Sequence, residues 1–258
     1  MTDCKSPVDL RSDTVTQPTE AMYESMLKAP LGDDGLDGDP TAEELESGVA
    51  TLLGKEAALF VPSATMGNLA AILAQTARQE LVVTEASSHI YTAERGAATL
   101  TGAFYEPIAG VAGAMNLERL EQVLVEPRGR LKTALVCMET SHNNAGGTAL
   151  PLEHMRQVHD LSRRHGASIH LDGARLFNAA VALRVAPAAI GLMGGLLIQS
   201  VFFAQQDLPQ YGMNVTTLLV PLFATAALAR RIVPENVAYV DLTYGQAFKL
   251  SAAYQGGI

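Results

Sequence analysis

The chain has 258 residues, 48% of them hydrophobic and 17% charged, which is enough for one large domain with a sizeable core. Its formal net charge of −9 argues against nucleic acid or an anionic membrane surface as the main partner. Cys4 and Cys137 provide no disulfide framework and no metal-ligand spacing, and residues 1–13 lack the apolar core of a signal peptide, so we expect a cytoplasmic protein without a structural metal.

The first third of the chain begins with turns. Residues 32–40 combine glycines and acids without apolar periodicity, which predicts a loop; their spacing is not that of an EF-hand, so a solvated loop is favoured over a calcium site. Thr41 and Glu44 have the spacing of a capping box, which predicts a helix from this point to about Leu53, ended by Gly54.

Apolar runs and helical periodicities alternate along the rest of the first 184 residues. The sequence predicts strands at 57–61, 81–84, 132–138 and 168–171. It predicts helices that begin near Gly67 and at 117–125 and 152–165. This alternation is typical of an α/β domain with a largely parallel sheet, in which active-site residues gather at the carboxyl ends of the strands.

Five polar segments lie at or near these strand ends or close to the start of the chain. They are DLRSDTVT (9–16), PSATMGN (62–68), SSHIY (87–91), ETSHNNAGG (139–147) and HLDGARLF (170–177). In the last segment, Asp172 could keep a ring nitrogen protonated and Arg175 could hold an anion, although a turn with a surface ion pair has the same pattern. Ser63 and Thr65 precede or begin a helix, where backbone N–H groups can bind phosphate.

Taken together in this order, the five segments resemble the threonine aldolase family over roughly residues 8–190. That family consists of lyases that depend on pyridoxal phosphate (PLP), within a wider group of β-eliminating lyases. The resemblance implies an α/β three-layer sandwich with a mainly parallel sheet, like the PLP-binding large domain of aspartate aminotransferase. It also implies a homodimer or homotetramer.

The resemblance implies roles for the residues around the cofactor. Asp172 would pair with the pyridine nitrogen, and His89 would stack on the ring face and could act as a base. Ser63, Ala64 and Thr65 would bind the phosphate. The PLP ring would then act as the electron sink of the reaction.

The resemblance also implies how an amino acid substrate would be held. Ser12 and Arg175 would bind the substrate carboxylate or an oxygen of the cofactor, and His142 would lie close to the β-hydroxyl. The implied reaction is the cleavage of a β-hydroxy-α-amino acid, such as threonine or allo-threonine, into glycine and an aldehyde.

The chain departs from the family at the lysine that normally forms the imine with PLP. Its lysines are at positions 5, 28, 55, 132 and 249, and none of them follows the HLDGAR segment by about thirty residues. If residues 200–208 align with the family strand that precedes this lysine, Asp207 stands in its place. Activity is therefore expected to be impaired, and the alternative is a catalytically silent PLP-fold protein or decayed copy that acts at most as an oligomer partner.

Residues 185–258 differ in composition from residues 1–184, because they hold only six acidic or basic side chains. We therefore divide the chain into a PLP-binding large domain (1–184) and a divergent apolar tail that completes the sheet or forms an interface; the family's small C-terminal domain is missing or altered. Residues 185–206 and 208–229 are long enough to span a bilayer, but their prolines and glycines favour a buried core or subunit contact over a membrane.

Overall fold

The computed structural model describes residues 13–15, 17–33, 35–61, 63–94, 100–126 and 131–197. Its internal contacts divide the chain into two units, one with residues 1–46 and 200–258 and one with residues 47–199. Within the described residues, the first unit contains η1 (Asp13–Val15), α1 (Glu20–Lys28) and the start of α2 (Pro40–Leu53). Most of the tail, including Asp207 and Lys249, lies outside the described residues, as does Ser12.

Helix α2 begins one residue earlier than predicted, and the capping box expected at Thr41 is wrong. The Asp39 carboxylate caps the helix, because its Oδ1 accepts hydrogen bonds from the backbone N–H groups of Thr41 (3.0 Å) and Ala42 (3.2 Å). The Thr41 hydroxyl instead donates to the Pro30 carbonyl at 2.5 Å. The helix ends at Leu53, and Gly54 follows with a φ of +64°, as a C-terminal glycine should.

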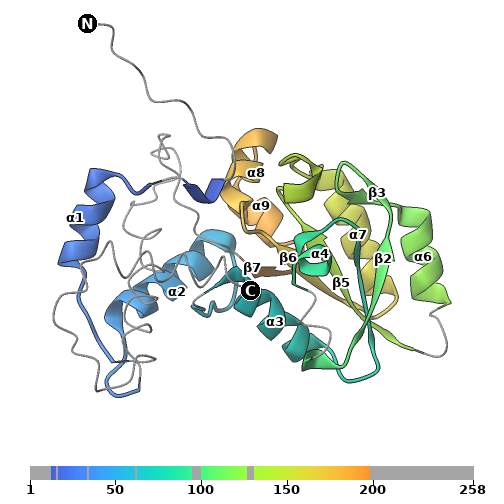
Figure 1. Cartoon of the computed structure of the whole chain (residues 1–258), viewed down its shortest axis with the longest axis horizontal. Helices are drawn as coiled ribbons and strands as arrows, with labels where there is room; N and C mark the ends of the chain where they lie inside the picture. Colours follow the sequence, from blue (N-terminus) through green and yellow to red (C-terminus); the bar gives the residue numbers. More distant parts are fainter. Residues whose placement is uncertain are drawn as a thin grey trace, which may run out of the picture. The chain divides into compact units, whose positions relative to one another are not determined.

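The second unit is built on a five-stranded sheet in which every neighbouring pair is parallel (Figure 1). The strand order is β2-β1-β5-β6-β7. These strands are β1 (Leu81–Glu85), β2 (Phe104–Ile108), β5 (Thr133–Glu139), β6 (Ser168–Asp172) and β7 (Gly195–Leu197). All seven residues of β5 are buried, which is expected for a central strand covered on both faces.

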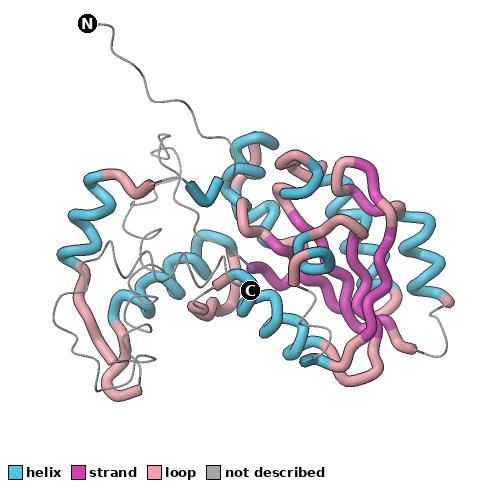
Figure 2. Tube along the Cα trace, viewed as in Figure 1, coloured by secondary structure: helices cyan, strands magenta, loops and turns pink. Residues whose placement is uncertain are grey.

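Helices surround this sheet, as the separate colouring of helices and strands in Figure 2 shows. The helices of the second unit are α3 (Ala64–Gln75), α4 (His89–Thr92), α6 (Leu117–Val125), α7 (Leu152–Arg164), α8 (Leu176–Leu183) and α9 (Pro187–Gly191), with η3 (Asn143–Ala145). Helix α3 packs against β5, β6 and β7, whereas α7 packs against β6 and α6. The predicted α/β architecture with a mainly parallel sheet is confirmed.

The core between α3 and the sheet is apolar. Ile72 of α3 packs with Val82 of β1 and with Leu135 and Cys137 of β5, and all four side chains are buried. Burial raises the pKa of the Cys137 thiol, because the charged thiolate would lose its hydration. Alternating residues of the parallel strands thus supply one continuous apolar layer.

Two differences from the predicted strands have simple reasons. Residues 57–61 do not form a strand, and Leu59 in this run is 77% exposed, so the apolar run is a surface segment. Strand β2 was not predicted, because its side chains alternate between exposed and buried and it contains Pro107, which an edge strand tolerates. A short hairpin of β3 (Gly110–Val111) and β4 (Ala114–Met115) follows it.

Among the described residues, we find no helix long and apolar enough to cross a membrane.

Candidate active site

Three buried acids mark the carboxyl ends of three neighbouring strands. Glu85 is the last residue of β1, Glu139 of β5 and Asp172 of β6, and the sheet register pairs Glu139 with Asp172. All three side chains are buried. This edge of the sheet is where the topology of a parallel α/β domain places a site.

Asp172 is held by one side chain and one backbone group. Its Oδ2 accepts a hydrogen bond from Asn68 Nδ2 at 3.0 Å, and its Oδ1 accepts one from the backbone N–H of Ala174 at 3.1 Å. The residue is 4% exposed. Since each carboxylate oxygen has more than one lone pair, Asp172 keeps the capacity to accept a further hydrogen bond from a ligand.

Asn68, on α3, forms hydrogen bonds with three other side chains. Its Nδ2 donates to Asp172 and also to Glu94 Oε1, at 3.1 Å. Its Oδ1 lies 2.8 Å from His170 Nε2, so His170 donates to it from β6. The Asn68 side chain is fully buried, and each of its polar atoms has a partner.

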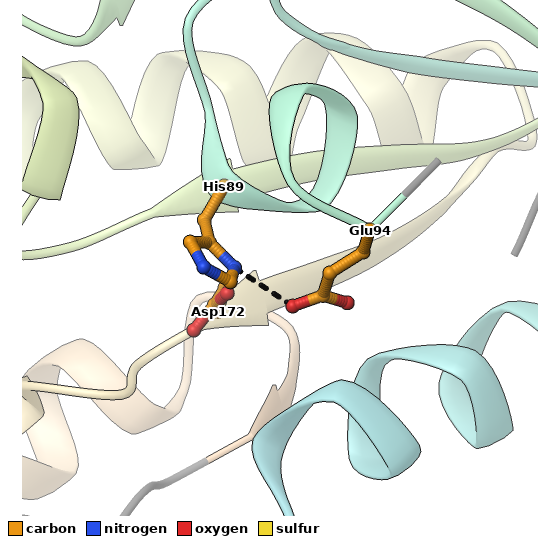
Figure 3. A group of neighbouring side chains, drawn as sticks. All are labelled: His89, Glu94 and Asp172. Carbon is orange, nitrogen blue, oxygen red and sulfur yellow. Dashed lines mark hydrogen bonds and ion pairs between the residues drawn. The ribbon is translucent and has the colours of Figure 1, made fainter. Parts of the chain in front are cut away.

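His89 is the first residue of α4, and Figure 3 shows its ring next to Asp172 and joined by a hydrogen bond to Glu94. Its Nδ1 is 2.8 Å from Glu94 Oε1, and one nitrogen or oxygen atom from each of the three residues lies within 4.8 Å of the other two. The hydrogen bond to Glu94 is the main reason why the pKa of His89 is raised; burial opposes this, and the charges of Glu94, Asp172 and Glu139 add to it.

His142 belongs to a neighbouring buried group. Its Nε2 lies 3.0 Å from Glu85 Oε2 and 4.0 Å from Glu139 Oε2. Glu139 Oε2 in turn accepts a hydrogen bond from the backbone N–H of His89 at 2.6 Å, so one carboxylate lies between the two histidines. The His142 side chain has no exposed surface, unlike His89, whose side chain is 40% exposed.

The predicted phosphate-binding residues begin helix α3. Ser63 is the N-cap, and its Oγ accepts a hydrogen bond from the backbone N–H of Met66 at 3.2 Å. Ala64 and Thr65 follow as the first two helical residues, so their N–H groups have no acceptor within the helix. One turn later, the same helix carries Asn68, which donates a hydrogen bond to Asp172.

Arg175, predicted to bind an anion, precedes α8 three residues after Asp172 and is half-buried. The structure thus brings Asp172 and His89 together. His142 lies on the other side of the Glu139 carboxylate, which contacts both histidines. The N-terminus of α3 is linked to the same group through Asn68. Ser12 lies outside the described residues.

The three lysines in the described part of the chain all have partners away from Asp172. Lys28 pairs with Glu24, and Lys132 pairs with Glu80. Lys55 donates to the carbonyl of Gly194 at 2.6 Å, just before β7 begins, and burial lowers the pKa of its amine. Within the described residues, therefore, no amine takes the place of the family lysine.

Sequence reasoning missed Asn68, Glu94, Glu139 and Glu85 as site residues. Asn68 lies within the PSATMGN segment, but an asparagine in a helix carries no signal of its own. Glu94 follows His89 by five residues, a spacing with no fixed meaning once the helix ends at Thr92. Glu139 and Glu85 could have been found, because each directly follows a predicted strand at the same edge as Asp172.

A protein-family model described as "Beta-eliminating lyase" matches residues 9–195. The chain belongs to this family. The match covers strands β1, β2, β5 and β6, the first residue of β7 and all of the site described above. It confirms the family resemblance that the five polar segments indicated.

Relatives and solved structures agree with this assignment. The chain is 45% identical over 184 residues to low-specificity L-threonine aldolase 1 of Arabidopsis thaliana, covering 69% of this chain and 51% of the relative. It is 39% identical over 178 residues to the low specificity L-threonine aldolase of Escherichia coli K12, covering 68% and 53%. The chain thus spans about half the length of the curated relatives it matches.

A solved structure of Leishmania major threonine aldolase has the same fold. The TM-score is 0.67 at 19% identity, with 95% of this chain and 75% of that chain covered. At this identity the likeness supports the fold alone.

A second family model, described as "Cobalt uptake substrate-specific transmembrane region", matches residues 157–255, which is less than half of the chain. The part of this range that the structure describes, up to Leu197, forms the end of α7 and the elements from β6 to β7 of the parallel-sheet unit. These residues therefore belong to the beta-eliminating lyase fold.

Proposed function

We propose that the chain provides the cofactor-binding part of a PLP-dependent lyase that cleaves threonine or allo-threonine into glycine and acetaldehyde. The observation that carries this proposal is the buried carboxylate of Asp172 at the carboxyl end of β6, beside the half-exposed ring of His89. The names of the relatives, low-specificity L-threonine aldolases, support the substrate class.

The residues of the site fit PLP in charge and in chemical type. Asp172 would hold the protonated ring nitrogen, and His89 would cover one face of the ring, since its side chain is partly exposed. The helix N-terminus at Ser63, Ala64 and Thr65 would hold the phosphate through N–H groups and hydroxyls. Bound PLP would supply the electron sink that stabilises the charge left when a bond at Cα breaks.

We further propose that Ser12 and Arg175 orient the substrate carboxylate, and that His89 accepts the proton of the β-hydroxyl. His142 was expected to lie beside that hydroxyl. Because its ring is fully buried against Glu85, we propose instead that it acts through Glu139, which holds the backbone N–H at the start of α4. His142 is then a positioning residue.

The absence of a suitable lysine among the described residues is the observation that favours a second candidate function. In that case the chain binds PLP weakly or not at all and acts only as a subunit of a homodimer or homotetramer. For the first function, we propose a turnover far below that of a relative that carries the lysine, because the exchange of substrate onto the cofactor would be slow. We propose a cytoplasmic protein in both cases.

The test is the release of glycine and acetaldehyde from L-threonine by the purified chain with PLP. We expect turnover above that of the same concentration of free PLP. The Asp172→Asn variant should lose about tenfold or more, since a hydrogen bond to a charged group is worth roughly 1.5–3 kcal/mol. Turnover equal to that of free PLP would contradict the enzymatic function.

Borohydride reduction followed by mass spectrometry separates the two candidates further. A PLP adduct on Lys249 or Lys5 would show that an amine outside the described residues completes the site. No adduct, together with no turnover, would favour the silent oligomer partner.

A further inference from the structure

Glu94 is a buried side chain that contacts His89 directly, and the family resemblance assigned no role to it. Its side chain is only 3% exposed, and its Oε1 lies 2.8 Å from His89 Nδ1. The other oxygen, Oε2, is buried and has no hydrogen-bond partner. Both bonds of this carboxylate, to His89 and to Asn68, therefore use the same oxygen.

Asn68 determines how Glu94 is held. If the amide were turned around, its oxygen would face the carboxylate oxygens of Glu94 and Asp172 at 3.1 Å and 3.0 Å, which would require both acids to be protonated. With Nδ2 facing them, one hydrogen goes to each carboxylate. In this orientation Asn68 Oδ1 accepts a hydrogen bond from His170 Nε2 at 2.8 Å, with the ring hydrogen on Nε2.

The hydrogen bond between His89 and Glu94 decides where the imidazole carries its proton. A carboxylate only accepts hydrogen bonds, so the neutral ring must carry its hydrogen on Nδ1. Nε2 then has a free lone pair, and no described residue forms a hydrogen bond with it. The His89 side chain is 40% exposed, so a ligand can reach the ring.

We propose that Glu94, held in place by Asn68, is a positioning residue that keeps the proton on Nδ1 of His89 and makes Nε2 the base of the site. In the same way, the carboxylate of a catalytic triad binds Nδ1–H of a histidine and leaves Nε2 to act as the base. The role of the base rests on the proposed function, but the Glu94–His89 pair is a property of the chain without cofactor.

The charges around the ring act in the same direction. Glu94 follows α4, Asp172 ends β6 and Glu139 ends β5, and all three negative charges raise the pKa of His89, although burial opposes them. A higher pKa makes the neutral ring a stronger base. Glu94 has the largest effect because it adds a direct hydrogen bond.

The proton position can be measured in the chain without PLP, by NMR of protein labelled with ¹⁵N-histidine. The chain has six histidines, so the His89→Asn variant identifies the signals of His89. We expect the Nδ1–H form in the neutral ring and a pKa above the ordinary value of about 6.5. Glu94→Gln, which keeps the shape but removes the charge, should lower this pKa by about one.

Glu106→Gln is the matched control. Glu106 is also a buried carboxylate at the sheet, but it pairs with Arg119 on α6. This variant should leave the titration of His89 unchanged. An Nε2–H form in the unmodified chain, or a pKa that Glu94→Gln does not lower, would overturn the proposal. The first of these outcomes does not depend on the folding of any Glu94 variant.

Kinetics then test the role of His89 as the base. If the chain cleaves threonine, the acidic limb of kcat/KM against pH should move to lower pH in Glu94→Gln, in step with the pKa of His89. A limb that stays in place while the NMR titration moves would show that His89 is not the base. A chain without turnover would contradict the proposed function but leave the NMR result as the test of the pair.

Discussion

Single residues at the carboxyl edge of the sheet explain how this chain tolerates three buried acids. Each acid accepts at least one backbone N–H: Asp172 from Ala174, Glu139 from His89 and Asn143, and Glu85 from Ser87. Hydrogen bonds to a charged acceptor are stronger than those between neutral groups and offset part of the lost hydration. The site is thus built into the loops that follow the strands.

The raised pKa of His89 leads to a prediction for stability. A group whose pKa is higher in the folded state stabilises that state fully below its unfolded pKa, and this contribution is lost as the pH rises through the folded pKa. The free energy of unfolding should therefore fall as the pH rises from about 6.5. Urea unfolding at several pH values should show a smaller fall for Glu94→Gln than for the unmodified chain.

His154 does not obscure this experiment. Burial lowers the pKa of His154, so its contribution to stability is lost as the pH falls below about 6.5, in the opposite window. Equal slopes above pH 6.5 for both proteins would contradict the assignment of a charged pair to His89 and Glu94.

Asp172 and His89 could be proposed as site residues from the sequence, because Asp172 ends a buried strand and His89 follows one, each within a specific motif. The structure places the two side chains close together. The sequence did not allow Asn68 or Glu94 to be predicted, since their roles depend on contacts across 104 and 26 residues of sequence. Only the parallel topology brings α3 beside the end of β6. For His142, the motif was recognised in the sequence, but the complete burial of its ring could not be predicted.

At the scale of whole elements, prediction was best where burial was uniform. Strands β1, β5 and β6 read as short apolar runs because both faces of the sheet are covered, and α6 and α7 show a clear helical period. Edge strand β2 has no such run, and α4 is a single turn, so neither has a periodic signal. The apolar run at 57–61 was predicted to be a strand because an apolar run in the sequence does not show whether its side chains are buried.

The hairpin of β3 and β4 gives a test of packing at this scale. Gly113 has a φ of +83°, and a Cβ added there would lie 2.6 Å from the ring of His142. Gly146 has a similar φ of +74° but open space around its Cβ position. Gly146→Ala should cost about 1–2 kcal/mol of unfolding free energy through backbone strain alone.

Gly113→Ala should cost a further 1–3 kcal/mol or so, because the methyl group must displace a buried ring. Chemical denaturation of the two variants under the same conditions measures the difference. Equal losses would mean that the hairpin can move away from His142, and that it does not fix this ring.

At the scale of the whole molecule, the described residues contain most of the groups that we propose for a PLP site. Asp172, His89 and the N-terminus of α3, which we propose to hold the ring nitrogen, the ring face and the phosphate of PLP, all belong to the sheet unit. The lysines among the described residues of that unit, Lys55 and Lys132, have other partners. The chain spans about half of each curated relative that it matches. We therefore propose that rapid turnover requires an amine from outside the described residues.

The thiol buried in the central strand gives the molecule its own reporter of unfolding. Cys137 is buried in one cluster with Ile72 and Leu135, and its raised pKa leaves almost no reactive thiolate. An alkylating reagent can therefore react only after β5 has separated from its neighbours. In a Cys4→Ser variant, the alkylation rate should fall about tenfold for each gain of about 1.4 kcal/mol in the free energy of global unfolding. Rapid modification under native conditions would show that the middle of the sheet opens without the rest of the fold.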